Sequence, residues 1–165
     1  MDPLTRLMTL VEDQNLSQLE IMREACQAIN QLIPKANRVS LWAFEDNNRQ
    51  IRSLVNFDAA SNEFSEGIIL KQADYPPYFK AIIEEDLVVA SDARNHSVTN
   101  CFNQSYFEPL GIYSLLDFIL HENFVATGVV CCESAGQKIE WSKDDIDNVR
   151  MVASVISFCF HLDKN

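Results

Sequence analysis

The chain has 165 residues, of which 47% are hydrophobic and 10% aromatic. These are values of a folded globular domain, and a chain of this length buries about 70% of its unfolded surface without disulfides or a structural metal. Its 13 Lys and Arg residues are outnumbered by 24 Asp and Glu, which gives a net charge of −11. Nucleic acids and anionic membranes bind basic surfaces, so neither is expected as a partner.

The five cysteines are an odd number, and several lie in apolar stretches. This usage is typical of reduced, buried thiols in a cytosolic protein. No apolar run approaches the roughly 20 residues of a membrane-spanning helix. The acidic first residues, MDPLTRLMTLVED, lack the basic and apolar regions of a signal peptide. We therefore expect a cytoplasmic protein.

In the first third of the chain, the sequence predicts helices that precede the first strand. Residues 1–16 form a helical extension, and the main domain covers 17–165. Ser17 and Glu20 have the spacing of a capping box, which starts a helix that Pro34 ends.

Alternating apolar and polar residues then predict strands at 38–46 and 50–58, a short strand within 64–70, and another at 87–90. The strand at 50–58 has more polar residues, so we place it nearer an edge of the sheet. The sequence DYPP at 74–77 opens a helix, because prolines fit only the first helical turn.

Residues 110–134 read as a β-hairpin, with its polar turn at 121–123 and both strands apolar on both faces. A strand with one solvated face would alternate apolar with polar residues. These strands are therefore expected at the centre of the sheet, covered on two sides. In the first of them we place Ile112, Leu116, Phe118 and Leu120 on one face and Tyr113, Leu115 and Ile119 on the other.

A second capping box, Ser142 with Asp145, starts the last helix, which runs to about residue 161. The order is helix, strands, a mixed middle segment, strands, helix. Neighbouring strands joined by short turns are antiparallel. The sequence thus predicts an α+β fold, with the terminal helices together on one face of an antiparallel sheet.

The ordered set of segments resembles the GAF domain family of sensor modules, over about residues 17–162. The segments that carry the likeness are RVSLWAFED at 38–46, ADYPPYFKAI at 73–82, SDAR at 91–94, PLGIYSLLDFIL at 109–120, GVVCCES at 128–134 and WSKDD at 141–145. The resemblance implies a GAF/PAS-like sheet of five or six antiparallel strands. It also implies that a segment around 64–109 closes a pocket on the face opposite the terminal helices.

The resemblance implies a regulatory domain of a bacterial signal-transduction protein. It would sense a small molecule, dimerise through its terminal helices, and pass ligand occupancy to an output domain such as a histidine kinase or diguanylate cyclase. The alternatives are a ligand-free dimerisation or scaffold module and, less favoured, a thiol-based reductase with Cys101 as the candidate exposed thiol.

The candidate ligand-binding residues combine aromatic rings with a few polar groups, the usual make-up of a small-molecule site. Asp117 lies in an apolar strand and must be paired, with Arg94 or with a backbone N–H. The alternative is that the aromatic residues simply form a second core. The candidates are Phe57, Tyr75, Tyr78, Phe79, Asp92, Arg94, Phe102, Tyr106, Tyr113, Leu115 and Asp117.

Each terminal helix carries two apolar stripes, although packing on a sheet requires one. One stripe is expected to face a second subunit, unless both are used within the monomer. The candidate dimer interface consists of Met22, Cys26, Ile29, Val149, Ala153, Ile156 and Phe160.

No catalytic residue, metal or cofactor is expected. The histidines, His96, His121 and His161, have no recognised metal-ligand spacing. Four scattered glycines leave no glycine-rich phosphate loop. The cyclic-nucleotide signature of some GAF domains is missing, and so is the adjacent cysteine and histidine pair typical of bilin-binding members.

Overall fold

The computed structural model describes residues 1–10, 12–13 and 15–159. The helices are α1 (Pro3–Leu10), α2 (Gln18–Leu32), α3 (Pro76–Glu85), α4 (Glu108–Leu110) and α5 (Lys143–Cys159). The strands are β1 (Arg38–Glu45), β2 (Gln50–Asp58), β3 (Glu63–Ser65), β4 (Ile69–Lys71), β5 (Leu87–Ala90), β6 (Ile112–Glu122) and β7 (Val125–Ala135). A 3-10 turn, η1 (Asn100–Phe102), and a π-helical turn, η2 (Asn103–Phe107), precede α4.

The sheet is antiparallel with the strand order β3-β2-β1-β7-β6-β5, and β4 also pairs with β2. It has seven strands rather than the expected five or six, because the strand expected within 64–70 is two strands. Gly67, with φ +90°, separates them. Both pair with β2, at its two ends, so β2 lies next to the edge as predicted.

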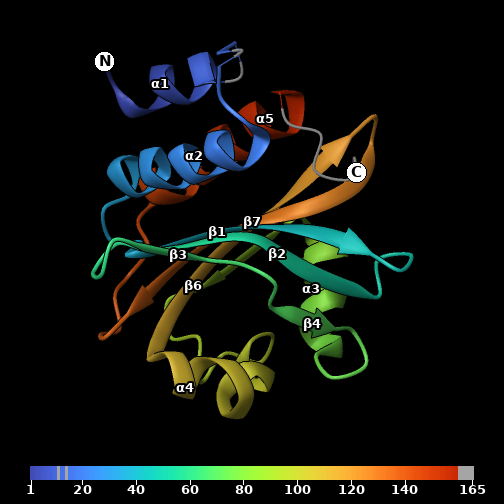
Figure 1. The fold of residues 1–165 in the computed structure, drawn as a ribbon. Coiled ribbons are helices and arrows are strands. Elements are labelled where there is room, and N and C mark those ends of the chain that lie inside the picture. The colour runs from blue at the N-terminus through green and yellow to red at the C-terminus, as the bar shows by residue number, and fades with distance from the viewer. Residues whose placement is uncertain (11, 14, 160–165) are drawn as a thin grey trace.

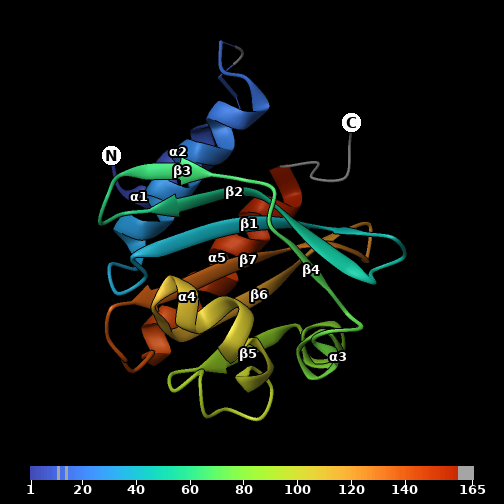
Figure 2. The ribbon, with the colours of Figure 1, turned by 60° about the horizontal axis from the view of Figure 1, so that its bottom comes forward.

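Helices cover both faces of the sheet, as the α+β prediction requires. Figure 1 shows α1, α2 and α5 above the sheet and α3 and α4 below it. In the turned view of Figure 2, α3 and α4 lie in front of the strands together with the segment that joins β5 to β6. None of the described helices is both long and apolar enough to cross a membrane.

Both predicted capping boxes are present. The Glu20 backbone N–H donates to Ser17 Oγ (3.1 Å), and the Ser17 N–H donates to Glu20 Oε1 (3.2 Å). At α5, Asp145 N–H donates to Ser142 Oγ (3.1 Å) and Ser142 N–H to Asp145 Oδ2 (2.8 Å). Lys35 Nζ lies 3.0 Å from the same oxygen, so the end of α2 is joined to the start of α5.

The stripes assigned to a dimer interface lie inside the monomer instead. Met22, Cys26, Ile29, Val149, Ala153 and Ile156 are only 0–7% exposed in the single chain. Together with apolar residues of the sheet and with Leu7 and Leu10 of α1, they form one core, which we call the helix-side core. A second subunit cannot reach these side chains, because the sheet and α1 already cover them. Phe160 lies outside the described residues.

The β6–β7 hairpin has two buried faces, as predicted. Leu116, Leu120, Val130 and Cys132 belong to the helix-side core, whereas Leu115, Ile119, Val129 and Cys131 belong to a second, pocket-side core. Ile112 also faces the pocket side, contrary to prediction, because the register shifts between Ile112 and Ser114. The turn consists of Asn123 and Phe124, both with positive φ, rather than 121–123.

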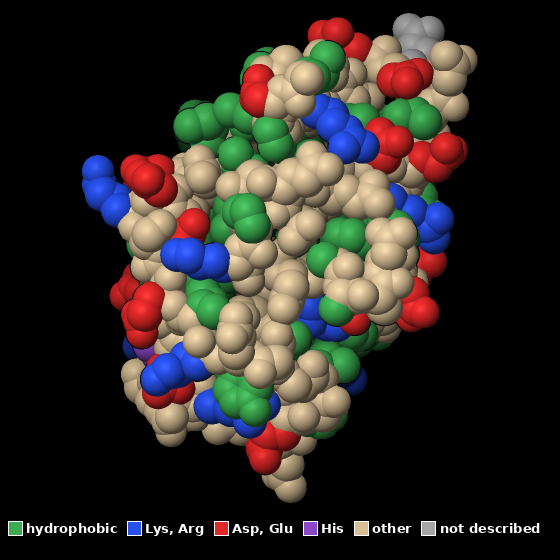
Figure 3. Space-filling view, turned by 90° about the vertical axis from the view of Figure 1, so that its left-hand side faces the viewer, with side chains coloured by type: hydrophobic (Ala, Val, Ile, Leu, Met, Phe, Trp, Pro, Cys, Tyr) green, Lys and Arg blue, Asp and Glu red, His purple; other side chains and the backbone are tan. Residues whose placement is uncertain are grey.

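On the face that Figure 3 shows, charged side chains are dispersed rather than segregated. The face in Figure 3 carries Lys and Arg side chains close to Asp and Glu, with uncharged residues between them. On this face the basic residues form no continuous patch.

Candidate ligand-binding site

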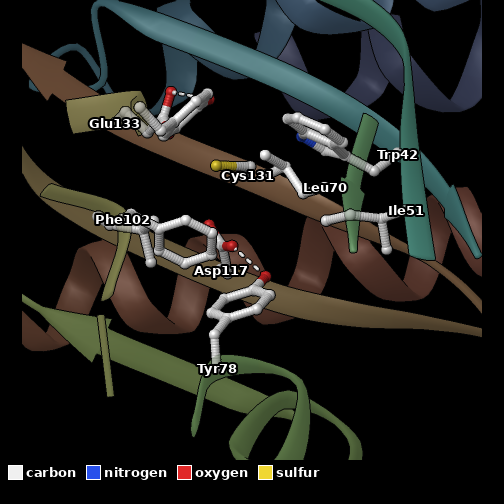
Figure 4. Close-up of a pocket in the computed structure, with 10 residues that line it drawn as sticks. Trp42, Ile51, Leu70, Tyr78, Phe102, Asp117, Cys131 and Glu133 are labelled. Atoms are coloured by element: carbon white, nitrogen blue, oxygen red, sulfur yellow. Dashed lines mark hydrogen bonds between the residues drawn. The ribbon is translucent and has the colours of Figure 1, made fainter. Parts of the chain in front are cut away.

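A small cavity lies in the pocket-side core, on the sheet face opposite the terminal helices (Figure 4). Its volume is about 10 Å³, roughly the space of one water molecule. Pockets for drug-sized ligands measure about 300–1,000 Å³. The site is therefore closed in this conformation. Its apolar lining consists of Trp42, Ile51, Leu70, Phe102 and Leu115, and its polar lining of Tyr78, Tyr106, Asp117, Cys131 and Glu133.

Asp117 is a carboxyl group within an otherwise apolar face. It is 2% exposed, and its Oδ2 accepts a 2.5 Å hydrogen bond from the Tyr78 hydroxyl. Its Oδ1 has no hydrogen-bond partner among the described residues. Burial raises the pKa of Asp117 from 3.8 to about 8, and the nearby Cys131 thiol and Tyr78 hydroxyl offset only part of this rise. Near neutral pH the carboxyl is largely protonated.

Glu133 is a second buried acid, 1% exposed, in the same cavity wall. The Tyr106 hydroxyl donates to its Oε1 (3.3 Å), and Arg38 Nε lies 3.5 Å from the same oxygen. Its Oε2 has no partner among the described residues. Burial raises the pKa of Glu133, and the positive charge of Arg38 opposes part of that shift.

The register of β6 and β7 places the two acids together. Asp117 pairs with Cys131, and Leu115 pairs with Glu133. The acids are therefore diagonal neighbours on one sheet face, a relationship that puts Cα atoms about 7–8 Å apart. The wall of the cavity thus holds two carboxyl groups, each bound by a tyrosine hydroxyl and each with one unpartnered oxygen.

Aromatic rings cover these acids. Phe102, from η1, packs edge-on to Tyr78 (ring centroids 5.1 Å apart) and stacks on Tyr75 (4.4 Å). Tyr106, from η2, meets Trp42 edge-on at 6.4 Å. The short helical turns between β5 and β6 therefore supply the cover of the cavity, while β1, β6 and β7 supply its floor.

Five of the predicted site residues line the cavity: Tyr78, Phe102, Tyr106, Leu115 and Asp117. Two more lie just behind them in the pocket-side core. Of these, Tyr75 makes a 2.6 Å hydrogen bond with Ser105, and Phe79 packs against Phe44 with ring centroids 6.5 Å apart.

The other four predicted residues, Phe57, Asp92, Arg94 and Tyr113, do not line this cavity. Phe57 packs on Phe64 in the helix-side core. The register between β1 and β2 shifts at Leu41/Trp42, so Phe57 faces the terminal helices although Ile51, on the same strand, faces the pocket. Arg94 does not meet Asp117. Its Nε donates to the Ile112 carbonyl (2.8 Å), and its guanidinium lies 3.9 Å from the Tyr113 ring centroid. These contacts hold the connection to β6 outside the cavity.

Asp92, the last of them, accepts hydrogen bonds from the Asn95 side-chain amide, with donor–acceptor distances of 3.0 and 3.1 Å. It shapes a local turn and does not line the cavity.

Sequence reasoning missed Glu133, Cys131 and Trp42 as cavity residues. Glu133 carried a usable signal, since it is an acid two residues after Cys131 on an apolar strand, and therefore on the same face. The sequence around Trp42 contains no signal that distinguishes a residue of a cavity wall from an ordinary core residue.

Four cysteines, Cys26, Cys101, Cys131 and Cys132, do not have the character of reactive thiols. Cys26, Cys131 and Cys132 are buried, and Cys101 is partly buried. Burial raises the pKa of each thiol, whereas reactive thiols have a lowered pKa. Within the described residues, no group of three or more His, Cys, Asp or Glu is arranged to hold a metal ion.

The model of the GAF domain family matches residues 18–160. The chain belongs to the GAF domain family. No curated protein matches this GAF domain in sequence.

Solved structures share the fold at low identity. The phycocyanobilin-bound GAF domain of a cyanobacterial phytochrome has a TM-score of 0.77 at 14% identity, over 94% of this chain and 90% of that one. The GAF domain of an Acinetobacter phosphoenolpyruvate-protein phosphotransferase has a TM-score of 0.70 at 12% identity, over 96% and 90%. The free methionine-R-sulfoxide reductase of Neisseria meningitidis, solved with its substrate, has a TM-score of 0.68 at 12% identity, over 95% and 85%.

Proposed function

We propose that this GAF domain is a regulatory sensor of a small molecule, which binds between the β6–β7 face and the η1–η2 cover. The observation that carries the proposal is the pair of buried carboxyl groups that line the cavity, Asp117 and Glu133, each with one oxygen that has no hydrogen-bond partner among the described residues. A buried polar group without a partner destabilises the fold. Its presence is accounted for when a ligand supplies the missing hydrogen bond.

The site is built so that its occupancy can reach the terminal helices. Ser114, on β6, donates to the Ser91 carbonyl (2.6 Å) and accepts from the Ile139 N–H (3.0 Å). Ser91 Oγ in turn accepts from the Trp141 N–H (3.1 Å), just before α5. Ser91 is the first residue of the segment that joins β5 to β6 and contains the η1–η2 cover. Movement of the cover would therefore shift the Ser91–Trp141 hydrogen bond, which lies just before the start of α5.

The signal would pass through α5 to an output domain such as a histidine kinase or a diguanylate cyclase in the cytoplasm. GAF-fold neighbours include a phytochrome and a phosphoenolpyruvate-protein phosphotransferase, which supports a regulatory role. A homodimer remains part of the proposal, with the contact moved to the outer face of α5. That face exposes Met151 and Phe158, which is 87% exposed.

The second candidate is a ligand-free dimerisation or scaffold module. It is favoured by the closed cavity of about 10 Å³, in which aromatic rings already fill the space between cover and sheet. In that case the Tyr78 and Tyr106 hydroxyls serve only to bind Asp117 and Glu133, and the cover stays closed. A thiol-based reductase remains the least supported function, and activity lost on Cys101→Ser would be needed to establish it.

Native mass spectrometry of protein purified without denaturation tests the proposal, followed by thermal shift with a metabolite panel. We expect a retained mass that disappears on denaturation, or a panel member that raises Tm. Leu115→Phe fills the cavity and should abolish that response, whereas Ile69→Phe changes an exposed position and should preserve it. A tight dimer that retains no ligand and responds to no panel member would instead favour the scaffold module.

A further inference from the structure

We propose that the pocket takes a small organic cation, a protonated amine or amidine with an apolar body, held by Asp117 and Glu133 between aromatic rings. This inference rests on the sensor function above and names the ligand class of the same site.

Once both carboxyl groups are ionised, the hydrogen-bonding capacity left over in the cavity consists of acceptors. The Tyr78 and Tyr106 hydroxyls already donate to Asp117 Oδ2 and Glu133 Oε1. Among the described residues that line the cavity, the side-chain oxygens without a hydrogen-bond partner are Asp117 Oδ1 and Glu133 Oε2. A ligand that satisfies both oxygens of ionised carboxylates must bring N–H or O–H donors. A carboxylate or phosphate ligand would bring further acceptors.

The net charge of the ionised site also favours a cationic ligand. Arg38 pairs with Glu133, at 3.5 Å. No described cation forms an ion pair with Asp117, and the nearest acid that acts on it, Glu133, disfavours its ionisation. The ionised site therefore has one negative charge more than it has positive charges. A monocation restores the balance, since buried charges in proteins are paired.

The walls suit the apolar body of such a ligand. The rings of Trp42, Tyr78, Phe102 and Tyr106 all line the cavity. Aromatic faces attract ammonium and guanidinium-like ions, and this attraction strengthens where water is excluded. Figure 4 shows the labelled Phe102 and Tyr78 rings on one side of the carboxyl of Asp117 and the Trp42 ring farther along the same face.

Binding requires the cover to move, because the present cavity holds about one water. Phe102 and Tyr106 belong to η1 and η2, between β5 and β6. Displacing Tyr106 frees Glu133 Oε1 and opens space beside Cys131. The ligand N–H then replaces the tyrosine hydroxyl as the donor, so the hydrogen bond that closes the site is exchanged rather than lost.

The experiment uses a panel of aryl and alkyl amines and amidines, each with its neutral isostere and its carboxylate analogue. Benzylamine, benzyl alcohol and benzoate form one such set. Binding is measured by titration calorimetry and by thermal shift. We expect the cations alone to bind, and Asp117→Asn to weaken them at least tenfold. Asp92→Asn, at a surface acid bonded to Asn95, should leave their affinity unchanged.

Proton release provides an independent readout. The groups facing Asp117 are Tyr78 from α3, Tyr106 from η2, Cys131 and Glu133 from β7 and, beyond Glu133, Arg38 from β1. A bound cation favours the ionised carboxylate. At pH 7 binding should release close to one proton, detected as different binding heats in phosphate and Tris. Below pH 8, affinity should rise about tenfold per pH unit.

The outcomes separate the two proposals. Tighter binding of a neutral isostere or a carboxylate, or equal cation affinity in Asp117→Asn, would overturn the cation assignment and leave the sensor function standing. No binding by any panel member, with no mass retained in native spectrometry, would overturn both.

Discussion

The Tyr78 hydroxyl donates a 2.5 Å hydrogen bond to Asp117 Oδ2 and thereby joins α3 to the middle of β6. Both groups are almost completely buried. The contact therefore holds α3 on the sheet, and through the packing of Tyr78 on Phe102 it also supports the cover. Among the described residues, Asp117 is the carboxyl group of the cavity that forms no ion pair with a cation. Stability, pH response and ligand access are coupled at this point.

Tyr78→Phe should lower the free energy of unfolding by about 1–3 kcal/mol, because it leaves a buried carboxyl without its donor. The matched control is Tyr75→Phe, which removes a part-buried hydroxyl bonded to Ser105 and should have a smaller effect. Urea denaturation of both variants at pH 7 makes the comparison. Equal losses in the two variants would mean that the Asp117 contact contributes nothing specific.

Asp117 predicts a particular pH dependence. Its pKa is 3.8 when unfolded and about 8 when folded, so the folded state retains a proton that the unfolded state releases. The contribution of this group to stability is full below about pH 4 and falls as pH rises to about 8, by at most about 1.4 kcal/mol per pH unit. Asp117→Asn should lack this decline. Urea titrations of both proteins from pH 4 to 8 give the difference, and parallel curves would contradict it.

Asp145 caps α5 and also binds Lys35. Asp145→Ala should therefore destabilise the domain by about 1–2 kcal/mol, in the range of a lost N-cap interaction. Asp144→Ala, one position earlier and exposed, should have an effect below about 0.5 kcal/mol. Thermal denaturation followed by circular dichroism distinguishes them. A Tm change of the same size in both would assign the effect to charge alone.

Ile156→Glu should unfold the domain, since it places an unpaired charge in a core position that is fully buried. Phe158→Glu, two residues later and exposed, should leave the fold intact. If the outer face of α5 forms a dimer contact, Phe158→Glu also halves the mass in solution, which light scattering measures. A folded Ile156→Glu protein would contradict the helix-side packing described above.

Phe124 is fully exposed at the tip of the β6–β7 hairpin, with φ +67°. A side chain with a Cβ is strained in this left-handed region, whereas glycine is not. Phe124→Gly should stabilise the domain by about 1 kcal/mol, with Val125→Thr as the exposed control that retains the backbone strain. A destabilised Phe124→Gly protein would indicate that the exposed ring packs on something in solution.

Much of the fold followed from local signals in the sequence. Capping boxes at Ser17 and Ser142, and a hairpin apolar on both faces, fix helix starts and central strands through contacts between near neighbours. The predictions of side-chain direction failed where a one-residue irregularity shifts the register between two strands. Ile112 turned to the opposite face because of an irregularity next to Ser114, and no propensity marks such a shift.

The site was predictable in part for the same reason. Tyr78, Tyr106 and Asp117 were recognisable as polar groups on apolar elements. Their pairing was not, because it depends on how the cover segment folds over the sheet. Arg94 was the nearest basic candidate in the sequence, yet three-dimensional packing directs it to the Ile112 carbonyl. The burial of the apolar stripes also depended on α1, which packs against α2 and contributes Leu7 and Leu10 to the helix-side core.

The pairing of β1 with β7, with Arg38 opposite Glu133, has a consequence for synthesis. Residues 46–124, about half of the chain, separate these strands in the sequence, so the centre of the sheet cannot form until β7 has left the ribosome. Until then β1 can pair only with β2, and the edge of β1 that pairs with β7 stays open. The nascent chain is therefore exposed to aggregation during most of its translation, and no shorter N-terminal piece should fold.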